Sequence, residues 1–356
     1  MTHTTTLHTE VEKRTLLFKQ PATTSRGSYT QRTIRLIHLS DDNLPGIIGT
    51  GECSPLPDLS IDALDDDQFD LLLLAILDDF RSTGHIDYDA LAPYPSILFA
   101  LESANWQLQR HGSYALTNTP FAQGLQGIPI NGLVWMGSYD EMTTRMNQKI
   151  SQGFKCIKIK IGGIDFDHEL MLLQSLRQTY GYNLQLRLDA NGSFTPDNAL
   201  QRLEQLAPYK IHSIEQPIKP HQWPDMAKLC QKSPIPIALD EELIGITTPT
   251  QRQQLLETIR PQYIVIKPTL HGGIAGTAQW IRLAHDLNIG SWLTSALESN
   301  VALNVIAHLA AAFYAPQTFG TTPMLHQGLG TGQLFEQNIN TPLQIKGEQL
   351  FFTPNK

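Results

Sequence analysis

The sequence between Lys158 and Lys267 decides the fold, because it holds five short apolar runs that each end in a charged residue. The runs are Lys158-Ile159-Lys160, Leu186-Arg187-Leu188-Asp189, Ser213-Ile214-Glu215, Ile237-Ala238-Leu239-Asp240 and Ile264-Val265-Ile266-Lys267. Their last residues are 29, 26, 25 and 27 positions apart, about the length of a strand, a crossover helix and two short loops. Since parallel barrel strands end at one common mouth, we expect the five charges to meet there.

The alternation of strand and helix patterns continues on both sides of these runs and predicts a barrel. Strands are expected near residues 129–134, 155–160, 184–189, 211–215, 236–240, 262–267 and 290–294. Helices are expected near 138–152, 166–180, 196–207, 222–231, 248–259, 272–287 and 299–313. An eighth short strand near Gln317 to Gly320 favours closure of a parallel α/β barrel. The alternative, an open doubly wound sheet, carries a glycine-rich turn after its first strand, and Asn131-Gly132-Leu133 is no such turn.

The part of the chain before residue 118 has the pattern of a separate α+β unit. Strands are expected over 15–20, 33–39 and 47–52, and helices over 65–81 and 94–110. Turn-forming residues indicate a loop over 21–29 and a linker over 118–129. After the barrel, residues 343–352 are expected to form a hairpin that turns at Gly347 and packs against the N-terminal unit. We therefore divide the chain into a unit of residues 1–125, to which 321–356 return, and a barrel of residues 126–320.

Composition narrows the classes of function. Of the 356 residues, 41% are hydrophobic and 17% are charged, which is typical of a globular protein. The net charge of −8, without a basic stretch, argues against a nucleic-acid partner. Cys53, Cys156 and Cys230 are expected to be free thiols in a reducing compartment. We find no signal-peptide pattern, and the apolar run 71–77 is too short to cross a bilayer. We expect a cytoplasmic protein without membrane contact, and no pattern indicates an oligomeric state.

The three acids at strand ends predict a metal site. Asp189, Glu215 and Asp240 can each offer one oxygen from neighbouring strands. Mg²⁺ prefers oxygen ligands and leaves coordination positions for a substrate, and Mn²⁺ is an alternative ion. The competing interpretation is that these acids cap helices or pair with basic residues on the barrel rim.

The lysines before and after the acids predict acid–base chemistry. Lys158 and Lys160 alternate with isoleucines, so both ammonium groups point to the same side of the strand, which we expect to be the lumen. Two close ammonium groups lower each other's pKa, which suits Lys160 to act as a base. Lys267 enters the mouth from the opposite side. The competing interpretation is that the lysines only balance the charge of the acids. Together with a metal, such lysines can remove a proton next to a carboxylate through a stabilised enediolate.

The combination Lys-x-Lys, Asp, Glu, Asp and Lys on successive strands resembles the enolase superfamily, in its muconate-lactonising branch. Within that branch, three segments resemble the o-succinylbenzoate synthase family: Gly51-Glu-Cys-Ser-Pro-Leu-Pro57, Thr294-Ser-Ala-Leu-Glu-Ser-Asn300 and Gln327-Gly-Leu-Gly-Thr-Gly332. The resemblance covers about residues 15–352. It implies a (β/α)₇β barrel with an N-terminal α+β capping domain that the C-terminal segment completes.

The resemblance also implies an activity and a set of residue roles. The activity is that of a carbon–oxygen lyase of menaquinone biosynthesis, a Mg²⁺-dependent syn dehydration of 2-succinyl-6-hydroxy-2,4-cyclohexadiene-1-carboxylate to 2-succinylbenzoate. Asp189, Glu215 and Asp240 would bind the metal, and Lys160 would be the base and then the acid. Lys267 would stabilise the enediolate from the other face. The supporting residues implied are Lys158, Asn191, Thr294, Ser295, Glu298 and Arg26.

Several of these supporting assignments have a plain structural alternative. Asn191 suits the turn Asn191-Gly192. Glu298, expected as a partner of Lys267, also suits the first turn of a helix. Arg26 suits a solvated loop. His271 is expected at the surface, and Trp135 is expected to fill the core.

Three alternative functions stay open at this point. An N-succinylamino acid racemase or a dipeptide epimerase of the same branch would use the same two lysines, one on each face of the substrate. The paired aspartates of dipeptide epimerases are absent from Phe319-Gly-Thr-Thr-Pro-Met-Leu325, which argues against the epimerase. The non-enzymatic alternative is a barrel that only binds an acidic metabolite.

Overall fold

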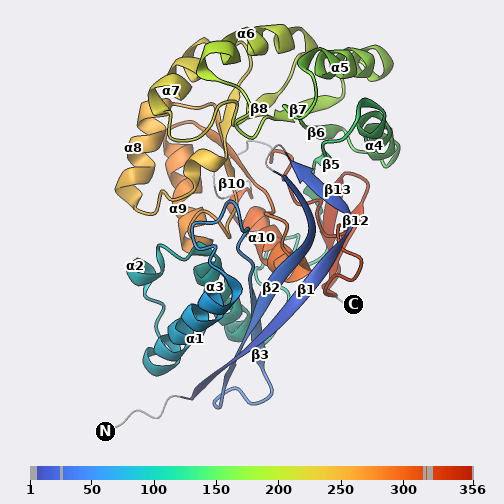
Figure 1. The fold of residues 1–356 in the computed structure, drawn as a ribbon. Coiled ribbons are helices and arrows are strands. Elements are labelled where there is room, and N and C mark those ends of the chain that lie inside the picture. The colour runs from blue at the N-terminus through green and yellow to red at the C-terminus, as the bar shows by residue number, and fades with distance from the viewer. Residues whose placement is uncertain (1–5, 25–26, 316–317, 319–323, 355–356) are drawn as a thin grey trace.

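The computed structural model describes residues 6–24, 27–315, 318 and 324–354. An N-terminal unit and a barrel lie against each other, with the barrel helices forming an arc around the sheet (Figure 1). No helix in the described part of the chain is both long enough and apolar enough to span a bilayer.

The N-terminal unit is built on a long antiparallel hairpin. Strands β1 (Leu7–Thr24) and β2 (Gly27–Asp41) pair along most of their length, and β3 (Ile48–Cys53) pairs with β2. The strands are longer than the sequence pattern predicted. The loop expected over 21–29 is mostly paired backbone, with Ala22 opposite Tyr29 after a register shift. The turn-forming residues therefore accompany a shift in the pairing register and do not end the pairing of β1 with β2.

Helices α1 (Asp66–Thr83), α2 (Tyr88–Leu91) and α3 (Pro95–Gln109) cover this sheet. Helix α3 is buried on nearly every side, because β3 lies on one flank and the barrel helices α9 (Gly273–Asp286) and α10 (Asn300–Phe313) lie on the other. Gly49 and Gly51 allow the close approach of β3, since a Cβ on Gly51 would lie 1.8 Å from the carbonyl oxygen of Ala100.

Seven parallel strands form the barrel sheet in sequential order, which confirms the predicted α/β barrel class. They are β5 (Gly132–Val134), β6 (Cys156–Lys160), β7 (Gln185–Asp189), β8 (Ser213–Glu215), β9 (Ile237–Leu239), β10 (Tyr263–Ile266) and β11 (Gly290–Leu293). The other barrel helices are α4 (Tyr139–Ser151), α5 (Phe166–Tyr180), α6 (Pro196–Leu206), α7 (Trp223–Lys232) and α8 (Pro249–Ile259), with short 3₁₀ turns η1 (Ala207–Tyr209) and η2 (Glu241–Leu243). Capping boxes at Ser138, Thr195 and Thr248 fix the starts of α4, α6 and α8.

The barrel closes through residues 327 and 328. Gln327 forms a parallel bridge with Ile130, just before β5, and Gly328 forms one with Thr294, just after β11. The eighth strand had been expected at 317–320, where residues 317, 319 and 320 lie outside the described residues. The closing segment therefore follows later in the chain than predicted.

The C-terminal hairpin of β12 (Leu343–Lys346) and β13 (Gln349–Phe352) pairs with β4 (Ile128–Pro129). Leu350 and Phe352 belong to the same core as the barrel, and Phe352 also contacts Phe121 of the unit of residues 1–125, against which the hairpin was expected to pack. Contact with the hairpin β1–β2 comes from residues 334–336, whose backbone bonds to β1 next to Phe18. The division into residues 1–125 and 126–320, with 321–356 returning, remains a proposal.

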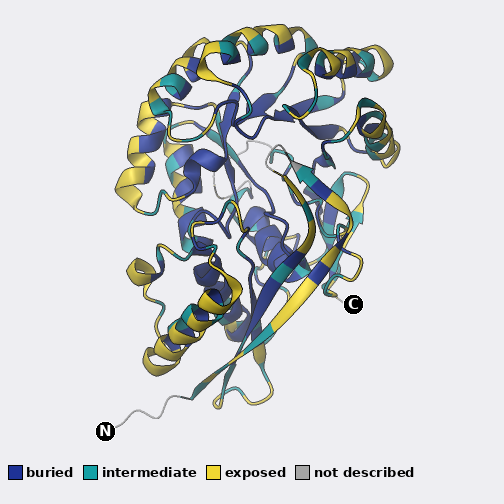
Figure 2. Ribbon diagram, in the orientation of Figure 1, coloured by how far each residue is buried: buried dark blue, intermediate teal, exposed yellow. Residues whose placement is uncertain are grey.

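Burial follows these layers (Figure 2). The strands of the barrel sheet and helices α3 and α10 are dark blue, whereas the outer faces of α1, α5 and α8 are exposed. One large core joins the barrel helices to the sheet, and a second core joins α1 and α3 to the N-terminal strands. A third core lies between the two units, above the carboxyl ends of the barrel strands.

Candidate active site

The three predicted metal ligands meet at the mouth of the barrel. Asp189 and Glu215 end β7 and β8 and lie opposite each other in the parallel register, and Asp240 directly follows β9. All three are fully buried, and one oxygen from each lies within 4.8 Å of the others. The sequence brings them together because each acid stands at the carboxyl end of a barrel strand or directly after it.

The donor set fits a hard divalent cation. Within the described residues, Glu215 Oε1 and Asp240 Oδ1 are buried and have no hydrogen-bond partner. Buried carboxylate oxygens normally find partners, so two orphaned oxygens at one point need an explanation. Three carboxylates with oxygens at such separations are suited to bind a divalent metal ion.

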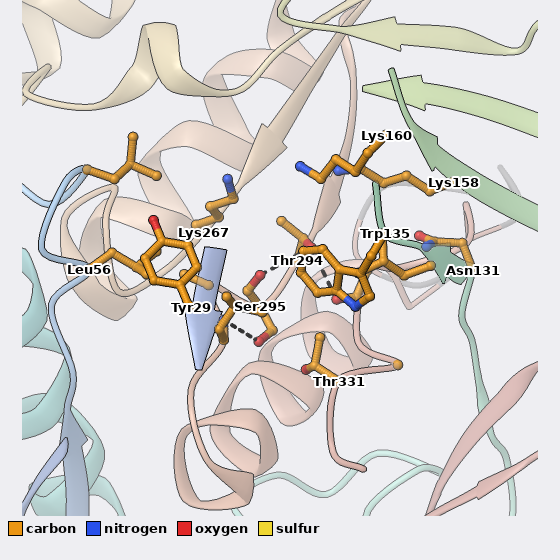
Figure 3. A pocket seen from close by; sticks show the side chains of 16 residues that line it. Tyr29, Leu56, Asn131, Trp135, Lys158, Lys160, Lys267, Thr294, Ser295 and Thr331 are labelled. Atoms are coloured by element: carbon orange, nitrogen blue, oxygen red, sulfur yellow. Dashed lines mark hydrogen bonds between the residues drawn. The ribbon is translucent and has the colours of Figure 1, made fainter. Parts of the chain in front are cut away.

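The three lysines surround the carboxylates from two sides. Lys160 Nζ donates to Asp189 Oδ2 at 2.6 Å and to Asn191 Oδ1 at 2.9 Å. Lys158 Nζ lies 2.8 Å from Asp189 Oδ2 and also contacts Glu215. Lys267 Nζ donates to Asp240 Oδ2 at 2.6 Å. Figure 3 shows Lys267 approaching the pocket from the side opposite to Lys158 and Lys160, as the sequence predicted.

The charges in this cluster separate the pKa values of the lysines. Burial, reinforced by Lys158 and Lys267, lowers the pKa of Lys160 despite its contact with Asp189. Burial also acts to lower the pKa of Lys158, but Asp189 and Glu215 outweigh it and raise that pKa. The pKa of Lys267 is likewise raised, because Asp240 outweighs burial. Mutual lowering was expected for both lysines of the pair and holds only for Lys160, which is therefore the lysine best suited to lose its proton.

The pocket above this cluster is closed by both units. Its charged end is formed by the three lysines. Tyr29 and Leu56 come from the N-terminal unit, and Trp135 lies across from them (Figure 3). The remaining lining residues are Leu59, Asn131, Leu133, Thr294, Ser295, Ala296, Leu297, Gly328, Gly330 and Thr331. Trp135 is a pocket wall and not the core residue that the sequence suggested.

Comparisons with known proteins agree with this geometry. Residues 141–350 match the family model described as enolase C-terminal domain-like. The o-succinylbenzoate synthase of Desulfotalea psychrophila is 41% identical over 362 residues, covering 93% of this chain and 95% of that protein. The crystal structure of MenC from Desulfotalea psychrophila LSv54 is 38% identical, with a TM-score of 0.79 over 97% of this chain and 99% of that one.

The chain belongs to the o-succinylbenzoate synthase family of the enolase superfamily. The fold is shared more widely in the superfamily. The substrate-liganded L-Ala-D/L-Glu epimerase of Bacillus subtilis has a TM-score of 0.80 at 20% identity, over 97% of this chain and 96% of that one. At that identity the likeness concerns the fold alone.

Among the supporting residues, Thr294 and Ser295 line the pocket, and Asn191 contacts Lys160 beside it. Asn191 adopts a positive φ of 45° in its turn, and its side chain also joins Lys160 to Glu241. Thr294 Oγ1 donates to the carbonyl of Gly328, and Ser295 Oγ donates to Glu298. Asn191 therefore forms the expected turn, and its supporting role at the site stays a prediction.

Two expectations about individual residues were wrong, and one lies outside the described chain. Glu298 bonds Thr269 and Ser295, while Lys267 donates to Asp240 and to no other acid among the described residues. His271 is 2% exposed, and its Nδ1 accepts the backbone N–H of Lys267, so it is no surface histidine. Arg26 lies outside the described residues.

Sequence reasoning missed the pocket residues that come from the N-terminal unit. Tyr29 follows the turn-forming segment and donates its hydroxyl to Asp58 at 2.7 Å. Leu56 lies in the segment 51–57, which the family resemblance had already singled out, and Leu59 follows this segment by two residues. That resemblance was the available signal, because no local pattern places these residues over a barrel formed more than 70 positions later.

Proposed function

We propose that the protein dehydrates 2-succinyl-6-hydroxy-2,4-cyclohexadiene-1-carboxylate to 2-succinylbenzoate, as o-succinylbenzoate synthases do in menaquinone biosynthesis. One observation carries this proposal: three buried carboxylates and two opposed lysines converge at the mouth of the barrel, in a chain 41% identical to a relative with that name.

The carboxylates are proposed to hold Mg²⁺, or Mn²⁺ in its place. Asp189, Glu215 and Asp240 would bind the ion through one oxygen each. When bound, it would stabilise the negative charge that grows on the substrate carboxylate during proton removal. The two orphaned oxygens of Glu215 and Asp240 support this assignment.

Lys160 is proposed as the base and then the acid. Its lowered pKa favours the neutral amine, which takes the ring proton next to the carboxylate. The carbon–oxygen bond to the ring hydroxyl then breaks, and the ammonium of Lys160 returns the proton so that water leaves from the same face. The ring becomes aromatic, and the enzyme regains its starting protonation state.

Lys267 and Lys158 are proposed to stabilise charge. The raised pKa values of both keep them as ammonium groups at neutral pH. Lys267 faces Lys160 across the pocket, so its charge would stabilise the enediolate on the second face of the ring (Figure 3). Lys158 contacts two of the metal ligands and would assist in holding the substrate carboxylate.

The decisive experiment is the variant Lys160→Ala, assayed by the absorbance change of aromatisation. We expect loss of dehydration with retained far-UV circular dichroism. The matched control is Lys155→Ala, an exposed lysine five positions earlier whose side chain is 77% accessible, and it should keep full activity. Retained activity in Lys160→Ala would place the base elsewhere.

A chelation experiment separates the enzyme from a binding protein. Removal of divalent ions should abolish turnover, and Mg²⁺ should restore it. A barrel that only binds an acidic metabolite would show no turnover after Mg²⁺ is restored.

The opposed pair Lys160 and Lys267 also favours a second candidate, racemisation of N-succinyl amino acids. In that reaction one lysine removes a proton and the other returns one to the opposite face. Optical rotation of N-succinyl amino acids, measured beside the dehydration assay, distinguishes the two activities.

A further inference from the structure

We propose that Arg32 is a positioning residue that fixes the pocket wall formed by Leu56 and Leu297 and thereby sets the affinity for the substrate. This inference rests on the proposed function, because the substrate concerned is the cyclohexadiene carboxylate of that reaction.

Arg32 joins two pocket loops that belong to different units. It lies in β2 and is 2% exposed. Its Nη2 and Nη1 donate to the carbonyl oxygens of Ser54 and Pro55 at 2.6 and 3.1 Å, and its Nε donates to the carbonyl of Leu297 at 3.3 Å. The first two carbonyls precede Leu56 in the N-terminal unit, and the third belongs to the loop after β11. Leu56 and Leu297 both line the pocket.

The backbone at Leu297 needs such support. Its φ is +67°, in the left-handed region that leucine rarely adopts. This conformation is strained for leucine and persists only where its surroundings hold it. Leu297 is held on both sides of the peptide chain, since its N–H donates to Ser295 Oγ and its carbonyl accepts from Arg32.

A carboxylate from the neighbouring strand holds the other end of the same loop. Glu52, fully buried in β3, accepts hydrogen bonds from Ser299 N, Ser299 Oγ and Ala302 N at the start of α10. Arg32 therefore binds the carbonyl of Leu297 within the loop 294–299, and Glu52 binds N–H groups where this loop leads into α10. The positive and negative side chains of adjacent cap strands together fix the loop that carries Ser295 and Leu297.

The reacting end of the pocket is positioned mainly by the barrel sheet, and Glu298 links it to this loop only through Thr269. The lysines and the proposed metal ligands lie on β6 to β8 or directly follow β9 and β10, whose positions are set by the barrel sheet. Loss of Arg32 should release the wall formed by Leu56 and Leu297 and leave the lysines in place. A misplaced binding wall weakens substrate binding more than it slows chemistry.

The test compares Arg32→Met with Arg35→Met. Arg35 lies on the same strand, is 3% exposed, and pairs with Asp66 and Asp70 rather than with the loops that carry Leu56 and Leu297. Both substitutions remove a buried guanidinium, so both should lower thermal stability. We expect KM for the cyclohexadiene carboxylate to rise about tenfold in Arg32→Met, with kcat changed less than about threefold. Arg35→Met should keep the wild-type KM.

Arg32→Lys and Arg35→Lys form the milder pair should the methionine variants fail to fold. Lysine can still donate to carbonyl oxygens, so Arg32→Lys should raise KM by less than Arg32→Met and by more than Arg35→Lys. Equal KM values for the position-32 and position-35 variants, or a fall confined to kcat, would overturn the assignment. Absence of turnover in the wild-type protein would instead refute the proposed function.

Discussion

Glu102 should make the stability of the protein fall as the pH rises, because burial raises its pKa to about 7, although the N–H groups of Ile274 and Ala275 act in the opposite direction. Glu102 lies in α3 and accepts those N–H groups at 2.5 and 2.9 Å, so it caps the start of α9 in the barrel. The carboxyl group therefore connects the two units and changes charge near neutral pH.

The sign follows from proton linkage. The folded protein binds the proton of Glu102 more tightly than the unfolded chain, in which the pKa is close to 4.5. The stabilisation is complete below pH 4.5 and is lost as the pH rises through about 7. The rise in pKa corresponds to about 3.4 kcal/mol in total, of which roughly 2 kcal/mol falls between pH 5.5 and pH 8.

The assay is urea unfolding of the wild type and of Glu102→Gln at pH 5.5 and pH 8. Glutamine stays neutral at both values, so the unfolding free energy of the variant should gain about 2 kcal/mol on the wild type between them. Subtracting the unfolding free energy of the wild type from that of the variant at each pH cancels the contributions of the other titrating groups. Glu204→Gln, an exposed glutamate of α6, is the control and should follow the wild type. A gap between wild type and Glu102→Gln that is equal at both pH values would refute the reasoning.

Three further perturbations test the site and the packing that supports it. Glu215→Gln should weaken Mg²⁺ binding at least about tenfold by calorimetry, since it removes a charged ligand; unchanged affinity would remove Glu215 from the ligand set. Lys267→Ala should lower kcat more than it raises KM, because its proposed interaction develops in the transition state; an effect on KM alone would make it a substrate anchor. Gly51→Ala should lower the unfolding free energy by about 3 kcal/mol, since the added Cβ would lie 1.8 Å from the Ala100 carbonyl oxygen; a wild-type urea midpoint would contradict the close contact of β3 and α3.

The barrel could be predicted because its information is local. A charged residue after an apolar run marks the carboxyl end of a strand. The period of two then places Lys158 and Lys160 on the lumen side. The parallel register of β7 and β8 alone places Asp189 opposite Glu215. Strand ends were therefore placed within one to three residues, and the charged cluster followed from them.

The errors concern contacts between distant parts of the chain. Gln327 closes the barrel because its backbone reaches residues 129–131, and its side chain also binds the N–H of Leu293. Nothing in its own segment has the length or the alternation of a strand. His271 was expected at the surface because it lies in a loop, but that loop folds under the barrel mouth onto Lys267. Local patterns cannot report such burial, since it depends on what covers the loop.

The burial of the charged cluster is itself an argument for function. Three carboxylates and three lysines occupy the upper layer of the barrel, and none is more than 8% exposed. Barrel interiors are normally filled by branched apolar side chains, whereas the layer below combines Ala238, Val265 and Trp292 with the buried Arg187, which stacks on Trp292. Replacing buried ion pairs by apolar residues is often neutral or stabilising. Stability alone would therefore favour apolar residues at the mouth, so the charged cluster there supports the catalytic roles proposed for it.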